Sequence, residues 1–582
     1  MQITIGPLDD VGRLVHEDDP AAQLALALAN LATRLTAAGL TWADLRTLQV
    51  RTTDVAELLG VYDTLTEHLT AMGSSPGTSV VEVPDLPVPG MTVALDAHAE
   101  RRTEPVSDHH HRRITMHAST TTPPVHDRVT RLEALVTACP GAVHGPGSAE
   151  YDAHRVPWNV AIDQQPAAVA VPGSGEQVAA VVAAAVRLGY RVAPQGTGHG
   201  AAGLAGRDLS DVVLLRTTAL TDVTVDPVAR TARVGSGAVW QDVVELAARH
   251  GLAALHGSSP DVGVAGYTLG GGIGWYARKH GLAANSGVAV EIVTGDGQLV
   301  RADAEHHPDL FWAVRGGGGS FGVVTALELR LLPIETAYAG MLLWDVAHAE
   351  PVLRTWATWA ADAPDEVTTS FRVLRFPPMP ELPDFLRGRQ VVVVDGAVLG
   401  DDAFGASQVA ALRALGPELD TFGRVPAAAL SRLHMDPEGP TPNVGGSTML
   451  RTLDEATIET FLAEVGPDAS PAILGAELRQ LGGALGRPAP GGGALDRLDA
   501  GFCAFLVAVA ATPEMAAAGR ATIDQVLGAL APHGSGRTFL NLAEQGGVDP
   551  RTGFTEASWQ RLATVRAQID PAGTFLANHP VG

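Results

Sequence analysis

Apolar residues recur at helical spacing in two stretches of the first hundred residues. Residues 20–38 carry them three and four apart and are followed by Gly39, which predicts a helix, and residues 55–72 predict a second helix. Apolar and polar residues alternate elsewhere, which predicts strands over residues 45–53, 79–83 and 91–97. The first hundred residues therefore predict a small α+β unit.

Short valine-rich strands alternate with helices from about Tyr151 onward. The elements predicted there are a strand over residues 167–171, a helix over residues 175–188 and a strand over residues 190–193. After residue 335 glycine clusters become rarer, and predicted strands such as residues 390–399 and 502–510 are separated by helices. The larger part of the chain thus divides into two halves of different character.

Residues 100–127 are polar, punctuated by proline and free of apolar periodicity, which is typical of a linker. His109, His110 and His111 lie within this stretch. Consecutive positions rarely converge on one metal ion, and no Cys or Glu stands at ligand spacing. We therefore predict a solvated linker and no metal site.

Composition narrows the classes of partner. The length of 582 residues favours two to four domains, and a formal net charge of −24 argues against nucleic acid or an anionic membrane surface as the main partner. Cys139 and Cys503 are the two cysteines, too few for a disulfide framework. The N-terminus lacks the order of a signal peptide, and no apolar run approaches the roughly 20 residues of a membrane span. We expect a cytoplasmic protein.

Glycine is concentrated in three clusters. The first, QGTGHG at residues 195–200, directly follows a predicted strand, so successive backbone N–H groups can form a nest for a pyrophosphate around His199. Taken alone, a glycine turn with an incidental histidine explains it equally well. The other clusters are residues 256–282 and 307–331. Residues 317–322 match GxGxxG, but a strand is predicted after them, which excludes the Rossmann mechanism of NAD binding.

Together the clusters resemble the FAD-binding domain of the vanillyl-alcohol oxidase superfamily, in its berberine-bridge-enzyme-like branch. The resemblance includes VPWNVAIDQQPAAVAVP at residues 156–172, VTGDGQLV at residues 293–300 and DPAGTFLANHPV at residues 570–581. It implies an α+β multidomain fold. The implied parts are a linker and lead-in at 101–150, a PCMH-type FAD-binding domain at 151–335, an antiparallel-sheet substrate domain at 336–540 and a C-terminal segment at 541–582 that returns to the FAD-binding domain.

The resemblance implies FAD bonded covalently through His199 to its 8α-methyl carbon. Many members add a second bond through a cysteine, but Ser259 and Pro260 stand at that place, so we expect a single link. Valine at position 262 goes with oxidase behaviour in the family, whereas Gln195 and Ser320 replace a common arginine and asparagine. The implied cofactor-binding residues are Pro194, Gln195, Gly196, Thr197, Gly198, His199, Gly200, Ser259, Pro260, Val262, Gly263, Gly266, Tyr267, Gly271, Gly272, Gly274, Val323 and Asn578.

The general bases usual in the family are absent or moved. Some members carry a glutamate near the place of Arg487, and Glu477, which precedes the GG step, is not an obvious replacement. Phe539 and Leu542 stand where tyrosines are common. The remaining candidates for acid/base or substrate-orienting roles are Tyr267, His256, Asp496 and Asn541, with Tyr267 preferred because its motif places it at the flavin. Packing is the competing explanation for each, and other titratable residues of this half are expected at the surface.

Residues 1–100 resemble the Rid (reactive intermediate deaminase) family, through AAGLTWADL at residues 37–45 and PGTSVVEVPDLPVPGMTVALDAHA at residues 76–99. Members that deaminate usually grip the substrate carboxylate with an arginine, and Thr78 stands at that place. Asp96 stands where glutamate is common. Because threonine cannot make the paired charge-assisted bonds of a guanidinium, the pattern favours assembly or docking, with an altered imine activity as the alternative.

These patterns favour an FAD-dependent oxidase of secondary metabolism that uses O2 and acts on a small alcohol, amine or polyketide-like carbon. Three alternatives stay open. The Rid-like unit could process an imine made by the flavin half, it could be a structural module that forms a homo-oligomer, or the whole protein could be a flavoprotein without catalysis.

Overall fold

The computed structural model describes residues 2–5, 20–37, 40, 42–53, 77–82, 91–99, 125–380 and 383–582. The chain divides into two compact units, Met1–Thr120 and Thr121–Gly582. The predicted helix at residues 55–72 and the histidines at positions 109–111 lie outside the described residues.

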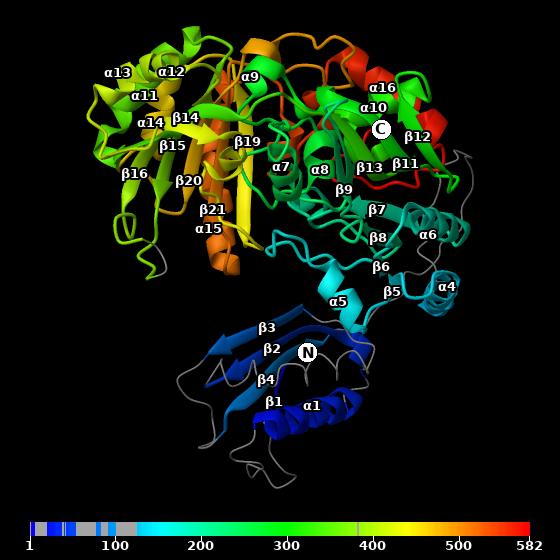
Figure 1. The fold of residues 1–582 in the computed structure, drawn as a ribbon. Helices are drawn as coiled ribbons and strands as arrows, with labels where there is room; N and C mark the ends of the chain where they lie inside the picture. Colours follow the sequence, from blue (N-terminus) through cyan, green and yellow to red (C-terminus); the bar gives the residue numbers. More distant parts are fainter. Residues whose placement is uncertain are drawn as a thin grey trace, which may run out of the picture. The chain divides into compact units, whose positions relative to one another are not determined.

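The N-terminal unit is a four-stranded sheet covered by helix α1 (Figure 1). Leu24, Leu28, Leu31 and Leu35 recur at helical spacing on α1 and are buried against the sheet. Strand β4 is antiparallel to β1 and β2, and β2 is parallel to β3. The elements are β1 (Gln2–Ile5), α1 (Pro20–Ala37), β2 (Leu45–Thr52), β3 (Gly77–Glu82) and β4 (Val93–Ala99). Each lies within two residues of its predicted bounds where one was predicted.

Two sheets form the half of the second unit that carries the glycine clusters. One has the order β5-β6-β8-β7, with β6, β8 and β7 parallel, and the other is antiparallel with the order β12-β11-β13-β10-β9. The strands are β5 (Val143–His144), β6 (Ala168–Ala170), β7 (Arg191–Gln195), β8 (Val212–Arg216), β9 (Val223–Asp226), β10 (Thr231–Gly235), β11 (Gly287–Val293), β12 (Leu299–Asp303) and β13 (Val323–Arg330). The helices are α4 (Val125–Ala138), α5 (Ala149–Arg155), α6 (Gly175–Arg187), α7 (Trp240–Ala248), α8 (Val264–Leu269), α9 (Ala277–His280) and α10 (Pro308–Gly317).

Two predictions for this half need correction. Strand β7 runs two residues further than predicted, because Pro194 and Gln195 continue the parallel pairing with β8. Helix α4 begins at Val125, inside the stretch predicted as linker, since Leu135 is fully buried in the core around α6. Strand β13 does follow the GxGxxG match at residues 317–322, as predicted.

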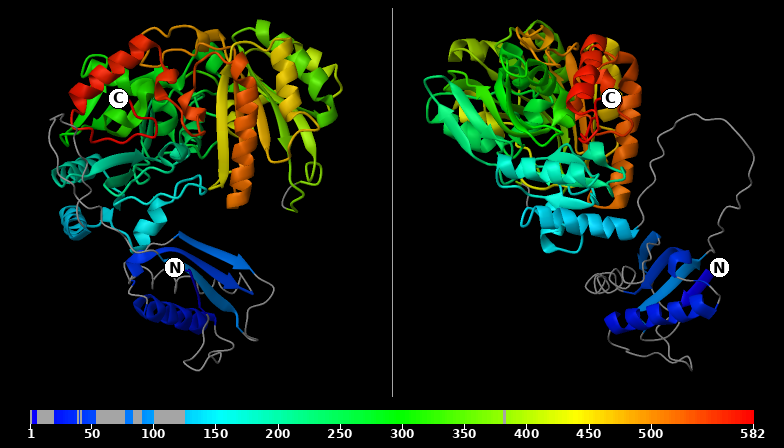
Figure 2. Two further views of the ribbon diagram at one scale, coloured as in Figure 1. Left: turned by 180° about the vertical axis from the view of Figure 1, so that it is seen from behind. Right: turned by 90° about the vertical axis from the view of Figure 1, so that its right-hand side faces the viewer.

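One antiparallel sheet forms the other half, with the order β17-β14-β16-β15-β20-β21-β19 and with β18 paired to β14. Its helix-covered face packs against α11, α14 and α15, and Figure 2 shows α14 and α15 lying along it. The strands are β14 (Thr336–Asp345), β15 (Val367–Arg375), β16 (Gln390–Val398), β17 (Leu419–Asp420), β18 (Gly423–Pro426), β19 (Asn443–Leu450), β20 (Gly475–Gln480) and β21 (Phe502–Val509). The helices are α11 (Ala349–Asp362), α12 (Asp402–Gln408), α13 (Ala410–Arg413), α14 (Glu455–Val465) and α15 (Pro513–Leu530).

Alternate residues of β15 and β20 point to opposite faces of this sheet. Phe371 and Leu478 join the helix-covered core, whereas their neighbours Arg372, Glu477 and Arg479 line a cavity on the other face. One sheet therefore carries an apolar core on one face and a charged wall on the other.

The C-terminal segment packs against the glycine-rich half. Helix α16 (Glu556–Ile569) contacts α10, and Val192 of β7 exchanges backbone hydrogen bonds with Thr574 (2.8 Å) and Leu576 (2.9 Å). The N–H of Val581 donates to Ser320 Oγ (3.1 Å). Among the described helices, none is long and apolar enough to cross a membrane.

Candidate functional site

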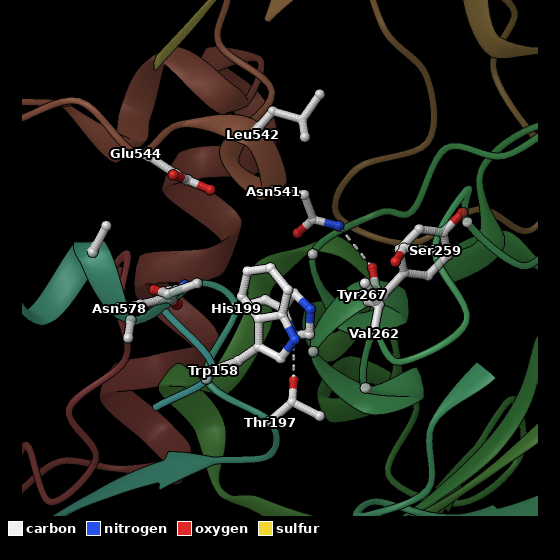
Figure 3. A pocket seen from close by; sticks show the side chains of 18 of the residues that line it. Trp158, Thr197, His199, Ser259, Val262, Tyr267, Asn541, Leu542, Glu544 and Asn578 are labelled. Atoms are coloured by element: carbon white, nitrogen blue, oxygen red, sulfur yellow. Dashed lines mark hydrogen bonds between the residues drawn. The ribbon is translucent and has the colours of Figure 1, made fainter. Parts of the chain in front are cut away.

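A cavity of about 490 Å³ lies between the glycine-rich loops and the charged face of the eight-stranded sheet. Figure 3 shows side chains that line it, among them His199, Tyr267 and Asn541. Its volume is in the range of about 300–1,000 Å³ that is typical of small-molecule sites. The loops at residues 194–200, 257–259, 262–263 and 316–319 form one wall, and residues of β15, β20 and β21 form the other. The two walls of the cavity thus come from the two halves of the second unit.

The loop that follows β7 requires glycine at position 198. Its φ of +89° lies in the left-handed region, and a Cβ there would stand 2.6 Å from Pro157 Cβ. This close approach lets Trp158 N–H donate to Thr197 O (2.9 Å). The loop therefore brings residues 157–158 against His199.

The His199 ring is held by a stacking contact and a hydrogen bond. The Trp158 ring stacks on it at 4.1 Å with an interplanar angle of 19°, and Thr197 Oγ1 shares a hydrogen bond with Nδ1 (2.8 Å). Asp261 Oδ1 lies 3.8 Å from Nε2, which is too far for a hydrogen bond. Nε2 is buried and has no hydrogen-bond partner among the described residues. The ring is therefore oriented while one nitrogen remains unpaired.

Asp261 is an ionised carboxylate beside this ring. It accepts hydrogen bonds from Trp158 Nε1 (2.7 Å), Ser259 Oγ (3.0 Å) and Gly439 N (2.9 Å). Burial would raise the pKa of Asp261, but the neighbouring His199 and the donors from Gly439 and Trp158 outweigh it and hold that pKa well below its usual range. Asp261 thus fixes the indole that stacks on His199.

A buried cation stands behind the loop at Gln195. Arg216 is 6% exposed, and its Nη1 donates to Gln195 Oε1 (2.5 Å). Burial lowers the pKa of Arg216 to about 10, so it remains charged at neutral pH. Arg216 therefore places a positive charge next to the position where the family commonly has arginine and this chain has Gln195.

Several features of the cavity fit FAD. Gly266 and Gly318 line it, and a Cβ built on either would meet no described atom within 4 Å, so the backbone is open to a ligand. Ser236 Oγ and His199 Nε2 are buried at its wall without a hydrogen-bond partner in the described parts of the chain. Open glycine backbone and unpaired polar atoms are what a large polar cofactor needs.

Tyr267 and Asn541 meet at the cavity. Asn541 Nδ2 donates to Tyr267 O (2.8 Å), and a Cβ on Gly270 would stand 1.6 Å from Asn541 Oδ1. The Tyr267 hydroxyl is buried without a hydrogen-bond partner among the described residues, and burial raises its pKa above the ordinary value. At neutral pH Tyr267 is therefore a neutral phenol.

The structure brings most of the predicted cofactor residues to the cavity and leaves others behind it. Those at the wall are Pro194, Gln195, Gly196, Thr197, Gly198, His199, Gly200, Ser259, Val262, Gly263, Gly266, Tyr267 and Asn578. Those that do not line it are Pro260, Gly271, Gly272, Gly274 and Val323. Gly274 is an example. A Cβ at this position would stand 1.8 Å from His256 O, so glycine is needed here for close backbone packing and not for contact with a ligand.

Two of the four catalytic candidates, Tyr267 and Asn541, line the cavity, and His256 and Asp496 do not. His256 Nδ1 bonds with Gly257 O (2.7 Å), its ring packs edge-on against Tyr276, and burial lowers its pKa to about 4. Asp496 pairs with Arg497 (3.6 Å).

A buried charged network on the sheet face was missed by sequence reasoning. His434 Nδ1 bonds with Asp395 Oδ2 (2.7 Å) and its Nε2 with Glu477 Oε1 (3.2 Å). Arg372 pairs with Asp395 (2.5 Å) and Arg479 with Glu477 (2.8 Å). The expectation that these titratable residues lie at the surface is therefore wrong. Their signal was charge inside otherwise apolar strands, as in FRVLR and ELRQ.

The network is held in its charged form. Burial and Arg372 oppose protonation of His434, but the Asp395 and Glu477 carboxylates outweigh them and raise the His434 pKa to about 9. Burial would raise the pKa of Glu477, but Arg479 and His434 hold it well below its usual range. Glu477 is therefore a fixed carboxylate with little capacity to take up a proton at neutral pH.

Glu544 is a second residue that the sequence analysis did not single out. It lines the same cavity as Asn541 (Figure 3). Burial raises its pKa to about 7, although Arg520 lowers it. The segment that carries it has no apolar periodicity, so the sequence did not indicate which side chains face inward.

Family models match both units. Residues 166–303 match the FAD binding domain model, and residues 4–101 match the endoribonuclease L-PSP model. Along the sequence, the chain therefore carries a Rid-like N-terminal unit followed by an FAD-binding domain. Both predicted resemblances are confirmed.

Solved structures share the fold of the larger unit. The 6-hydroxy-D-nicotine oxidase from Arthrobacter nicotinovorans has a TM-score of 0.66 at 24% identity, covering 76% of this chain and 98% of that one. Berberine bridge enzyme from Eschscholzia californica has a TM-score of 0.67 at 18% identity, covering 78% and 98%. The predicted fold class is confirmed.

Curated relatives are similar over a shorter stretch. The FAD-dependent monooxygenase prx3 of Penicillium roqueforti is 32% identical over 241 residues, which are 40% of this chain and 46% of that protein. The (R)-6-hydroxynicotine oxidase of Paenarthrobacter nicotinovorans is 34% identical over 211 residues, 36% of this chain and 46% of that protein. The xylooligosaccharide oxidase of Thermothelomyces thermophilus is 34% identical over 215 residues, 36% and 42%. The match thus spans less than half of each relative.

Replacing Asp395 by alanine should destabilise the protein strongly. The change leaves Arg372 as a buried cation without its carboxylate partner, while His434 keeps only Glu477, which costs about 3–5 kcal/mol of unfolding free energy. The matched control is Glu455→Ala, which breaks the exposed pair with Arg354 and should change stability little. Denaturant unfolding followed by circular dichroism checks both, and equal losses would contradict the account.

Stability should also fall as pH rises through the His434 transition. Its folded-state pKa of about 9 lies above the ordinary value, so its contribution is complete below about pH 6.5 and is lost as pH rises through about 9. Melting temperatures measured across this window should decline less in a His434→Gln variant than in the wild type. Parallel curves for the two proteins would show that His434 does not titrate there.

Proposed function

We propose that this protein is an FAD-dependent oxidase whose flavin is attached covalently through His199 and which oxidises a small alcohol or amine. The observation that carries the proposal is the His199 ring at the cavity wall, stacked on Trp158 and with Nε2 unpaired among the described residues. The FAD binding domain match and the oxidase relatives support it.

The loops on the glycine-rich side would hold the cofactor. Backbone N–H groups at residues 196–200 and the positive charge of Arg216 behind Gln195 suit an anionic pyrophosphate. Ser236 Oγ and the open backbone at Gly266 and Gly318 offer further contacts. FAD held there would supply the hydride acceptor, with O2 as the final acceptor of the electrons.

The opposite wall would hold the substrate. Arg479 and Glu477 present fixed charges there, and Phe505 and Leu374 present apolar surface. The names of relatives indicate suitable test donors: 6-hydroxynicotine, a xylooligosaccharide and a glucooligosaccharide. A donor must carry a C–H bond next to a hydroxyl or amine for oxidation to C=O or C=N.

Replacing His199 by alanine should release the flavin. A carbon–nitrogen bond survives denaturation, whereas contacts with the cavity are lost when the protein unfolds. Acid precipitation should therefore leave the flavin in the wild-type pellet and in the supernatant of His199→Ala. His306→Ala, which changes an exposed histidine, should behave like the wild type. Flavin released freely from the wild type would contradict the covalent link.

For the N-terminal unit we propose an assembly role. Thr78 lies on β3 at the place of the arginine that binds carboxylates in the Rid family, so the residue type needed for that grip is missing. The unit has its own buried core around Leu24, Leu28 and Leu48 and can therefore act as a separate module.

Removing residues 1–120 should lower the oligomeric state and leave the reaction product unchanged. The larger unit keeps its own cores, so it should remain folded. Light scattering on the full chain and on residues 121–582 checks the first point, and product identification checks the second. Equal subunit numbers would contradict the assembly role, and a changed product would favour imine processing by the N-terminal unit.

A further inference from the structure

The Glu544 carboxyl fits into a notch made by glycine in the neighbouring strand. It follows the turn Leu540–Leu542, which packs on β19. A Cβ on Gly445 of β19 would stand 2.5 Å from Glu544 Oε2 and 3.4 Å from the ring of Phe505. The strand thus leaves room for the carboxyl at the cavity wall beside an aromatic ring.

This carboxyl makes no hydrogen bond in the described parts of the chain. Oε2 is buried without a hydrogen bond, and Arg520 Nη1 donates to Gly445 O (2.7 Å) and not to Glu544. The next residue shows the contrast: Gln545 accepts from Ser447 N (3.1 Å) and donates to Ser447 O (2.9 Å). A buried acceptor left unpaired beside a fully paired neighbour calls for a functional explanation.

The other carboxylates of the site are already engaged. Glu477 is bonded by Arg479 and His434, and Asp261 accepts three hydrogen bonds. Asp436, also at the wall, is half-buried and lies 3.5 Å from Ser258 Oγ. Tyr267 is a neutral phenol. Glu544, half-buried like Asp436, is therefore the carboxyl of the described wall that has a buried oxygen without a hydrogen bond.

We propose that Glu544 is the catalytic base of the oxidase, a step that rests on the proposed function. A donor loses two hydrogens and two electrons in the reaction. The proton of its O–H bond, or of the N–H bond of its protonated amine, passes to Glu544, the C–H hydrogen leaves as hydride to the FAD of the proposed function, and a C=O bond or a C=N bond of an iminium forms. O2 takes up the hydride's proton and two electrons together with the proton from Glu544, which gives H2O2.

The surroundings of Glu544 suit this proton transfer. Burial raises its pKa to about 7 against the opposing charge of Arg520 on α15, so both protonation states are accessible near neutral pH. Strand β19 carries no ionisable residue, and the ionisable residue of β21, Cys503, is a neutral thiol because burial raises its pKa to about 12. Arg520 is thus the charged group that acts on Glu544 from the elements packed against it.

The test compares Glu544→Gln with Glu514→Gln, the same change at an exposed position of α15. Flavin reduction by the three donors is measured in the absence of oxygen from about pH 5 to about pH 9. Glu544→Gln should keep its flavin content, lose about 10²- to 10⁴-fold in reduction rate and lose the rise in rate through about pH 7. Glu514→Gln should match the wild type. An unchanged rate and pH profile in Glu544→Gln, or a loss of bound flavin, would overturn the assignment.

A second measurement needs no substrate. Because the folded-state pKa of Glu544 is raised, its stability contribution is complete below about pH 4.5 and declines as pH rises through about 7. Glu544→Gln should therefore gain melting temperature over the wild type between these values, and a constant difference would show that Glu544 does not titrate. Failure of all three donors with the wild-type protein would count against the oxidase function itself and not against this proton uptake.

Discussion

The Asp261 carboxylate ties together the chain segments that surround His199. Its hydrogen bonds reach Trp158, Ser259 and the backbone of Gly439, which come from three separate parts of the sequence. The indole held in this way stacks on the His199 ring, and Gly198 allows the close approach that brings the two together. A ring fixed in this manner can present one nitrogen to the cavity without a further loss of side-chain freedom. The proposed cofactor attachment depends on this arrangement.

The eight-stranded sheet supplies the opposite wall because side chains along its strands alternate between its two faces. Its apolar positions are buried under α11, α14 and α15, and its charged positions would be costly in the same core. Arg372, Glu477 and Arg479 therefore lie on the cavity face, where Arg372 pairs with Asp395 and Arg479 pairs with Glu477. Buried charges joined in this way are rigid, which suits substrate positioning better than proton transfer. The Glu544 carboxyl, which has an unpaired oxygen, is the group proposed for the proton transfer.

Sequence periodicity predicted the elements well and the site unevenly. Helix α6 follows from apolar spacing because one of its faces is buried, and strand β13 follows from a short apolar run whose first five residues are all buried. The motif also pointed to His199 and its glycine neighbours. It could not tell that Gly274 packs behind the cavity, since membership in a motif does not show which side of the backbone faces the ligand. Glu477 was named and set aside as a base, but its buried charged network was not predicted, because its partners His434 and Arg479 meet it only when the chain is folded.

The most direct test of the central claim is peptide mass spectrometry of the purified protein. Cleavage after Arg191 and Arg207 yields a peptide in which His199 is the single histidine. The account predicts that this peptide is heavier by the mass of FAD less two hydrogens, with fragment ions that place the addition on His199. An unmodified peptide from protein that still contains its full complement of flavin would contradict it.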